Sequence, residues 1–463
     1  MSTIKWVNLQ RDAESFHNPL PYTDDYELLP DLFYIGKEQD HHVIFAPLVM
    51  RLYVIPQTVL SSISPLTFYP EARVALLESF LLASKKQIST LSPQVKIPKL
   101  SSHIRLLMTD ACNLACTYCY GMGGRDNRQI NLAHLSVLLK SLPSDTPLSV
   151  EFHGNGEPTL AFEQIKMAYE MIHSEFPATQ FTLQSNGLFR DSVADWLIAH
   201  NVYTAFSIDG PDWIHNVQRP VHQKQRDGHE QVMARLHYFQ KHSSLMGKAS
   251  ITTVTAFSLP HLPQIYDFLK QNGIRHMKIN PLVKMGRATI SEDPLHSVPD
   301  IHLFADHLAT LSSQAFRDHI LIDSDFLYSL HTHKPSQMRC GAITPTLTLD
   351  PEGNLLACSD AYYLSTPETN PFFWGDVKSG HLHINVVKQT HLRERTVGQM
   401  ATCQNCLLIW NCSGGCLVEN YAQNGDIYRP IANYCVARRH FAIQYLLSLA
   451  SMHLDSKILG ALP

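Results

Sequence analysis

The distribution of cysteine constrains this chain more than any other feature of its sequence. Three cysteines stand close together as Cys112, Cys116 and Cys119, with the spacing C-x3-C-x2-C. None of the ten cysteines lies between 120 and 339, and the other seven lie in the last third of the chain. The first ten residues contain no basic stretch followed by an apolar run, so we predict no signal peptide and a cytoplasmic, reducing location. Cysteines in such a compartment are more often metal ligands than disulfides.

Residues 101–325 show the alternation that is typical of a parallel α/β fold. Strand-like apolar runs recur along this region, at 103–109, 148–153, 179–185, 202–208, 249–256 and 275–280. Helical stretches lie between them, for example at 161–173, 229–241 and 262–272. Such alternation indicates parallel strands joined by crossover helices. Six units are too few for a closed eight-stranded barrel, so we predict an α/β fold built on a partial (β/α)6 TIM-like barrel, with functional residues at the carboxyl ends of its strands.

Residues 1–100 form a separate N-terminal α+β segment without cysteine. The stretch 41–56 predicts two strands around a turn at Pro47. The stretch from Pro70 to Ser89 predicts a helix. We expect this segment to be either a cap on the barrel or a small peptide-docking module.

The C-terminal third has a different character. Residues 326–440 carry the second group of cysteines, with Gly and Asn between them, so we predict a loop-rich domain organised by metal. Residues 441–463 are expected to form a C-terminal helix and tail, with a closing amphipathic helix from Val436 to Ala450. The formal net charge of −4 does not favour nucleic acid or an anionic membrane as a general partner. No segment approaches the ~18 uninterrupted apolar residues of a transmembrane helix.

The cysteine triplet follows directly on the first predicted strand of the barrel. Three thiolates do not complete a four-thiolate site, but a cubane 4Fe–4S cluster held by three cysteines keeps one iron open for a substrate or cofactor. A zinc site needs a fourth ligand, and the nearest histidine in sequence, His103, lies at the far end of the strand. The ring of Tyr118 is placed to shield such a cluster. The segment from Cys112 to Cys119 resembles the signature of the radical S-adenosylmethionine (SAM) superfamily.

This resemblance implies a specific chemistry. In the superfamily, the reduced cluster cleaves SAM to methionine and a 5′-deoxyadenosyl radical, which abstracts hydrogen from the substrate. The cofactor supplies the difficult chemistry, and the protein positions and shields it.

The second strand ends in a turn that is similar to the Gly-Gly-Glu-Pro motif of the superfamily. Gly154 precedes it, Asn155 replaces the first glycine, and Gly156, Glu157 and Pro158 complete it. The resemblance implies that this turn binds the amino group of SAM. An ammonium group suits a carboxylate and backbone carbonyls, which glycine lets approach closely.

Two further strand ends match the superfamily. Ser185 and Asn186 resemble the Thr-Asn-Gly of relatives, which implies contacts to polar groups of the cofactor. Ser207, Asp209 and the later Arg219 match a Ser-x-Asp-Gly-Pro pattern with a downstream arginine. By the same resemblance, Asp209 accepts from ribose hydroxyls and Arg219 pairs with the SAM carboxylate. For Asp209 alone, local side-chain bonds within a turn remain the alternative. The end of the sixth strand, 278–282, resembles the adenine wall of the family.

The seven remaining cysteines follow one order. Cys340, Gly353 and Cys358 give C-x12-G-x4-C, and the next four cysteines give C-x2-C-x5-C-x3-C before a last Cys435. This order is similar to the SPASM extension of radical SAM enzymes, which holds two auxiliary 4Fe–4S clusters. The resemblance assigns cluster II four ligands, Cys403, Cys406, Cys412 and Cys435, and cluster I three ligands, Cys340, Cys358 and Cys416.

Two alternatives remain open for these cysteines. Cluster I lacks a fourth cysteine, so its last site is open or filled by another ligand, for which His331 and His333 are available in sequence, although we favour solvated loop residues. A zinc ribbon also uses C-x2-C pairs, but seven cysteines are one short of two four-cysteine sites. The resemblance therefore implies three 4Fe–4S clusters and SAM as cofactors.

Relatives with this extension mostly modify peptides or proteins. We therefore predict oxidative modification or crosslinking of a ribosomal precursor peptide, with a reductant such as flavodoxin or ferredoxin as the second partner. The nearest alternative is an anaerobic sulfatase maturase that forms formylglycine, although those enzymes usually place the triplet nearer their start. Two other classes are a non-catalytic iron–sulfur electron carrier and a zinc-organised interaction protein. Asp360, two residues after Cys358, is the candidate base.

Overall fold

The computed structural model describes most of the chain from 102 onward and four short parts before it. The described residues are 5–8, 26–28, 32–57, 82–84, 102–143, 147–222, 227–290, 297–327, 330, 335–340, 342 and 346–454. His331 and His333 therefore lie outside the described residues.

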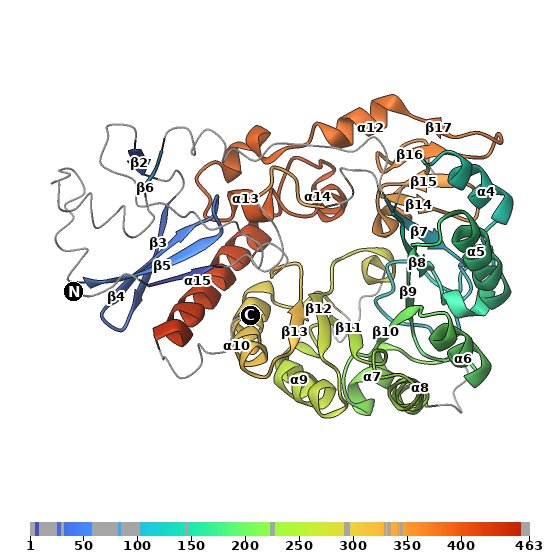
Figure 1. Ribbon diagram of the computed structural model, residues 1–463, viewed down its shortest axis with the longest axis horizontal. Helices are drawn as coiled ribbons and strands as arrows, with labels where there is room; N and C mark the ends of the chain where they lie inside the picture. The colour runs from blue at the N-terminus through green and yellow to red at the C-terminus, as the bar shows by residue number, and fades with distance from the viewer. Residues whose placement is uncertain are drawn as a thin grey trace.

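The centre of the molecule is one continuous sheet of eleven strands (Figure 1). Its first part is parallel and forms the predicted partial barrel, in the order β13-β12-β11-β10-β9-β8-β7. These strands are β7 (His103–Leu107), β8 (Ser149–His153), β9 (Gln180–Ser185), β10 (Tyr203–Ser207), β11 (Ala249–Val254), β12 (His276–Pro281) and β13 (Leu321–Asp323). All six predicted strands are confirmed within a few residues, and the short β13 adds a seventh.

Helices cover the outer face of the barrel strands (Figure 1). They are α4 (Leu132–Lys140), α5 (Phe162–Glu175), α6 (Asp191–Ala199), α7 (Asp212–Gln218), α8 (Gly228–His242), α9 (Leu262–Gln271) and α10 (Ile301–Arg317). In α9, Leu262, Ile265 and Leu269 are buried at helical spacing, so one face packs on the sheet. Side chains of Asn131, Asp227 and Asp300 cap the starts of α4, α8 and α10. The opposite face of the sheet is left for the site.

The Cys-rich region continues the same sheet beyond β7. Strand β14 (Leu347–Leu349) pairs in parallel with β7, and β15 (Asn354–Leu356), β16 (Phe373–Asp376) and β17 (His383–Ile384) follow antiparallel. Its helices are short: α12 (Val386–Arg393), α13 (Ile409–Cys412) and α14 (Leu417–Asn424). This pairing sets Cys358, just after β15, beside the first strand of the barrel.

The N-terminal segment contributes a separate antiparallel sheet (Figure 1). Its order is β1 (Lys5–Asn8), β5 (Arg51–Pro56), β4 (His41–Ala46) and β3 (Phe33–Glu38), so the predicted two strands around Pro47 are confirmed. The long helix α15 (Ala432–Leu454) packs against this sheet and against α10. The predicted boundary between 440 and 441 therefore falls inside one helix.

One element of the N-terminal prediction is wrong. Within the predicted helix from Pro70 to Ser89, the described residues Leu82–Ser84 form strand β6, paired antiparallel with β2 (Tyr26–Leu28). Pairing with a distant strand overrides the local helical preference of this stretch. The rest of the predicted helix lies outside the described residues. Among the described helices, none is both long and apolar enough to cross a lipid bilayer.

Candidate active site

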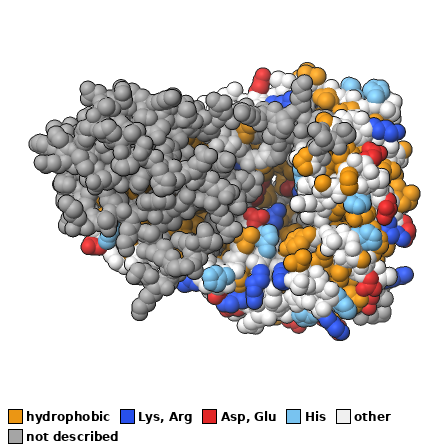
Figure 2. Space-filling view, in the orientation of Figure 1, with side chains coloured by type: hydrophobic (Ala, Val, Ile, Leu, Met, Phe, Trp, Pro, Cys, Tyr) orange, Lys and Arg blue, Asp and Glu red, His pale blue; other side chains and the backbone are white. Residues whose placement is uncertain are grey.

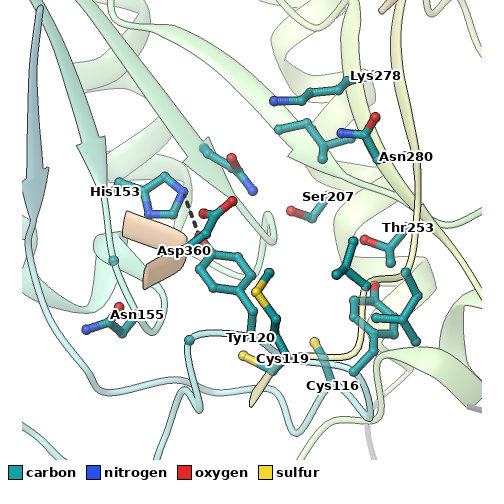
Figure 3. A pocket seen from close by; sticks show the side chains of 18 of the residues that line it. Cys116, Cys119, Tyr120, His153, Asn155, Ser207, Thr253, Lys278, Asn280 and Asp360 are labelled. Atoms are coloured by element: carbon teal, nitrogen blue, oxygen red, sulfur yellow. Dashed lines mark hydrogen bonds between the residues drawn. The ribbon is translucent and has the colours of Figure 1, made fainter. Parts of the chain in front are cut away.

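A cavity of about 530 Å³ lies between the carboxyl ends of the barrel strands and the Cys-rich region. Figure 2 shows the described surface hollowed near the middle of the molecule, with basic and acidic side chains beside the hollow. The barrel contributes the cysteine triplet and the strand-end motifs to the wall, and the Cys-rich region contributes Cys340, Asp360, Cys416 and Glu419. Both groups of predicted functional residues thus face one space (Figure 3).

The three thiols of the triplet lie at one end of this cavity. Burial, with a smaller contribution from the neighbouring thiols of the triplet, raises the pKa values of Cys112 and Cys116 to about 12. Arg287 holds the loop by donating from Nη1 to the carbonyl of Cys116 at 3.0 Å and from Nη2 to that of Gly123. In the described residues, no group of three or more His, Cys, Asp or Glu is compact enough for a single metal ion.

The triplet loop packs directly on the turn after β8. A Cβ added to Gly156 would lie 1.9 Å from the carbonyl oxygen of Ala111, and one added to Gly121 would lie 2.6 Å from that of Asn155. Only glycine permits this approach. Three thiols above a glycine-lined turn, open to a cavity on one side, fit a three-cysteine cluster that shares its open iron with a bound cofactor.

Glu157 is held by neighbours from two strand ends. Its Oε1 accepts from Thr159 and, at 2.7 Å, from the hydroxyl of Ser185, while its Oε2 accepts from the backbone N–H of Asn186 at 2.8 Å. Burial raises the pKa of Glu157, and these hydrogen bonds oppose the shift. Glu157, Ser185 and Asn186 all line the cavity, so the structure brings the two predicted motifs together.

Asn155 and the glycines of the turn also line the cavity. The amide nitrogen of Asn155 donates to Asp110 Oδ1 at 2.8 Å, which fixes the orientation of the amide. Its Oδ1 is buried without a hydrogen-bond partner among the described residues. Gly154 lies against the carbonyl of Thr109, and Ser207 lines the facing wall.

The structure does not bring Asp209 to the cavity wall. Its carboxylate is fully buried and does not line the cavity. Oδ2 accepts from the Tyr118 hydroxyl, from Gln218 at 2.8 Å and from Arg219 Nε at 2.9 Å, and Oδ1 accepts from Arg219 and the N–H of Thr253. With its lone pairs engaged by protein donors, Asp209 has no room for a ribose hydroxyl.

Asp209 instead positions two residues that do face the cavity. Arg219 lies over the ring of Tyr118, 5.4 Å from its centre, and both line the wall. Burial raises the pKa of Asp209, but the charges of Arg219 and His215 and the hydrogen bonds to the carboxylate together hold that pKa below its ordinary value. A cofactor that binds at this wall would therefore meet an Arg219 guanidinium that is already paired with the Asp209 carboxylate.

Asp360 lies on the cavity wall that is formed by the first two barrel strands. Its Oδ1 accepts from the hydroxyl of Ser359 at 3.1 Å, and Ser359 accepts from Arg105 Nη1 at 2.7 Å. Figure 3 shows Asp360 beside His153 and Tyr120, whose ring nitrogen Nε2 and hydroxyl oxygen lie 3.4 Å apart, and across the space from Lys278. Burial lowers the pKa of His153, which favours the neutral imidazole.

Sequence reasoning missed several residues of this wall. Arg105 and Glu151 are direct neighbours on β7 and β8, bonded at 2.8 Å, and a charged pair inside two apolar strands was the available signal. On the far wall, burial and then the charge of Asp325 raise the pKa of Glu419 to about 7. Nothing in the local sequence marks Glu419. The titratable cavity residues absent from the prediction are Arg105, Tyr120, His153, Asp325, Arg339 and Glu419.

The seven C-terminal thiols separate into two neighbourhoods. Burial raises the pKa of Cys416 well above its ordinary value, and Cys340 and Cys358 are among the groups that raise it further. Burial and the thiols of Cys412 and Cys403 raise the pKa of Cys435 to about 11. Burial and the thiol of Cys412 likewise raise the pKa of Cys406. This division follows the two predicted ligand sets, while ligation itself stays a prediction.

Sequence comparison finds no matching family model. The chain is 24% identical over 346 residues to an uncharacterised protein of Archaeoglobus fulgidus, covering 73% of this chain and 79% of that one. It is 22% identical over 328 residues to a cysteine-type anaerobic sulfatase-maturating enzyme of Clostridium novyi, covering 66% and 84%.

Structural comparison relates the same fold to an AdoMet-binding enzyme. The structure superposes on anSMEcpe with bound AdoMet and Cp18Cys peptide with a TM-score of 0.61 at 19% identity, over 76% of this chain and 99% of that one. The chain has the radical SAM fold. This radical SAM fold also superposes on Streptococcus suis SuiB bound to the precursor peptide SuiA, with a TM-score of 0.55 at 15% identity over 80% and 82% of the chains.

Proposed function

We propose that this radical SAM enzyme oxidatively modifies or crosslinks a ribosomal precursor peptide with the help of three 4Fe–4S clusters. One observation carries the proposal. A single cavity is lined by the triplet Cys112, Cys116 and Cys119, by the strand-end motifs, and by Cys340, Cys416 and Asp360 from the Cys-rich region. A cavity of this make-up suits a reaction in which radical formation and removal of the second electron occur on one substrate.

Different barrel residues would hold the cluster and SAM. The triplet would bind a cluster that supplies reductive cleavage of SAM to a 5′-deoxyadenosyl radical. Glu157 and the carbonyls of the 154–156 turn suit the amino group, because Glu157 Oε2 accepts one hydrogen bond from the described residues and retains acceptor capacity. Ser185, Asn186 and Ser207 offer polar contacts, and Arg219 offers a cation.

Asp360 is the residue that we propose as the base. A two-electron oxidation removes one hydrogen atom from the substrate, and then one proton and one electron. Arg105 and Ser359 fix the Asp360 carboxylate on the cavity wall, where it can take that proton. Cys340 and Cys416 line the same cavity, so a cluster held by them would lie within reach of the electron. An external reductant such as flavodoxin or ferredoxin would supply electrons to the clusters.

The N-terminal sheet supports a peptide partner. Strand β3 stands at the end of its sheet among the described strands, so it can accept a leader peptide as an added strand. SuiB and anSMEcpe, which share the fold, have structures with bound peptides.

A sulfatase maturase is the second candidate. The relative from Clostridium novyi is a cysteine-type anaerobic sulfatase-maturating enzyme, and one from Bacteroides thetaiotaomicron is a serine-type enzyme, at 21% identity over 355 residues. Conversion of a cysteine or serine to formylglycine in a sulfatase peptide would favour this candidate over crosslinking.

The first experiment is an iron and sulfide analysis of anaerobically purified protein, with SAM cleavage measured on the same sample. About twelve irons per chain and release of 5′-deoxyadenosine are expected for three cubane clusters. Iron without SAM cleavage would favour an electron carrier. Stoichiometric zinc without iron would replace the proposal by a zinc-organised protein.

A further inference from the structure

Three residues join the two predicted auxiliary ligand sets. Cys412 ends helix α13 and Cys416 precedes helix α14, so only Ser413, Gly414 and Gly415 lie between them. All three have positive φ angles, of 48°, 80° and 78°. Consecutive left-handed residues turn the chain sharply, and glycine is favoured in this conformation. The carbonyl groups of this loop consequently turn toward one buried side chain.

That side chain is Arg395. Its Nη1 donates to the Ser413 carbonyl at 2.6 Å, and its Nη2 donates to the Gly414 carbonyl at 2.8 Å and to the Gly415 carbonyl at 3.3 Å. Nε donates to the carbonyl of Ile427 at 3.2 Å. The guanidinium fork thus holds every residue of the loop that separates the two ligand sets.

The charge of Arg395 has no acidic partner in the described part of the chain. The side chain is fully buried, and its acceptors among the described residues are all neutral carbonyls. Burying a cation without a counter-ion is strongly unfavourable. The described residues therefore leave this guanidinium without an anion beside it.

Two other buried arginines near the same loop differ from Arg395, because each lies near a carboxylate. Arg339 lies 3.4 Å from Asp325, and Arg438 lies 3.5 Å from Glu419. Burial lowers the pKa of each, but nearby negative groups outweigh it and raise both pKa values. For Arg395 burial prevails and the pKa is lowered. Arg395 therefore differs from its neighbours in lacking a carboxylate.

The groups that oppose this lowering are thiols of both sets. They are Cys340 and Cys416 from the set of cluster I, and Cys412 and Cys403 from the set of cluster II. Cysteines lose their protons when they bind metal, so a loaded protein places negative charge on both sides of the guanidinium. We propose that Arg395 is the shared counter-ion of the two auxiliary clusters and raises the reduction potentials of both. The inference rests on the proposed function.

The sign of the effect follows from charge. Reduction adds an electron to a cluster, and a nearby buried cation stabilises the more negative state, which raises the potential. A higher potential makes a cluster a better acceptor for the electron left by substrate oxidation. Because one cation lies between both sets, its removal should shift both auxiliary clusters together.

The test is a redox titration of iron-loaded protein followed by electron paramagnetic resonance. In Arg395→Gln, both auxiliary potentials should shift to more negative values, while the SAM-binding cluster of the triplet keeps its potential. Arg438→Gln is the matched control, because that arginine has a carboxyl group, Glu419, 3.5 Å away, and Cys412 is the thiol of the two sets that acts on it most. Its shift should be smaller and confined to cluster II.

Unchanged auxiliary potentials in Arg395→Gln overturn the inference, and so does an equal shift in all three clusters. If Arg395→Gln fails to load iron, the Arg395→Lys variant distinguishes a need for the charge from a packing role. A lysine variant with full iron and near wild-type potentials supports a need for the charge, whereas one that also fails to load assigns the fork a packing role only. Wild-type protein without iron–sulfur clusters would instead be a failure of the proposed function.

Discussion

The barrel and the Cys-rich region build their parts of the cavity in different ways. In the barrel, polar side chains at the strand ends satisfy one another, as Glu157 does with Ser185 and Asp209 does with Arg219. In the Cys-rich region, helices α13 and α14 have four and eight residues, and buried Arg395 meets only carbonyls. The polar groups of the barrel site are therefore satisfied by the protein, whereas we propose that the Cys-rich site gains charge balance and stability from metal.

Replacing the triplet should have the largest effect. Changing Cys112, Cys116 and Cys119 to Ala is expected to abolish SAM cleavage and remove about four of about twelve irons. The barrel should keep its fold, because its strands and outer helices do not depend on that cluster. Iron analysis, product chromatography and hydrogen exchange of β8 to β10 check the three parts. Loss of protection in these strands would break the comparison.

Asp360→Asn tests the contribution of the Cys-rich region to chemistry. Product formation on a peptide that wild-type protein modifies should fall by about 10²–10⁴-fold, because the amide cannot take the proton. SAM cleavage should continue and become uncoupled from product. Exposed Asp426→Asn is the control. Equal loss of cleavage and product would assign Asp360 to SAM binding.

Asp209→Asn tests whether the barrel site is held together by its own charges. Leaving Arg219 without a partner should lower the free energy of unfolding by about 3–5 kcal/mol. The pKa of Asp209 is below its ordinary value, so its stabilisation is present above the unfolded pKa of about 3.9 and is lost as pH falls further. The difference from wild type in urea titrations should therefore shrink below about pH 4. Exposed Asp212→Asn should show no such loss.

Removing two ligands of cluster II should loosen only its own region. In Cys403→Ala/Cys406→Ala, amide exchange across α13 and α14 should rise by about tenfold or more, equivalent to about 1.4 kcal/mol of local stability. The triplet variant serves as the matched control, since it removes a cluster from the barrel. Equal protection of α13 in both variants would show that this region holds itself without metal.

The smallest effect is expected at the N-terminal sheet. Lys37→Pro on β3 removes one backbone donor from the edge strand, whereas Lys37→Ala keeps it. Affinity for a precursor peptide should fall by about tenfold or less in the proline variant, because one hydrogen bond contributes about 1 kcal/mol. Fluorescence anisotropy with a labelled peptide measures it. Similar affinities in the two variants would remove β3 from the docking surface.

The sequence predicted the barrel strands and the residues gathered at their ends, because strand periodicity and motif spacing are local. It did not predict that both oxygens of the Asp209 carboxylate accept hydrogen bonds from protein groups, since one donor, Thr253, lies on another strand. Strand β6 replaced part of a predicted helix because its partner β2 is distant in sequence. Arg395 gave no signal, because its role depends on a loop eighteen residues away. Contacts across the fold decided each of these cases.

The parallel pairing of β14 with β7 has a consequence for synthesis of the chain. Strand β7 is made early, yet the neighbour that covers its second edge is made only after the whole barrel. During translation, or in a fragment that ends at 325, one edge of the sheet stays open to pairing with other chains. Recombinant barrels of this protein should therefore be designed to extend past β16.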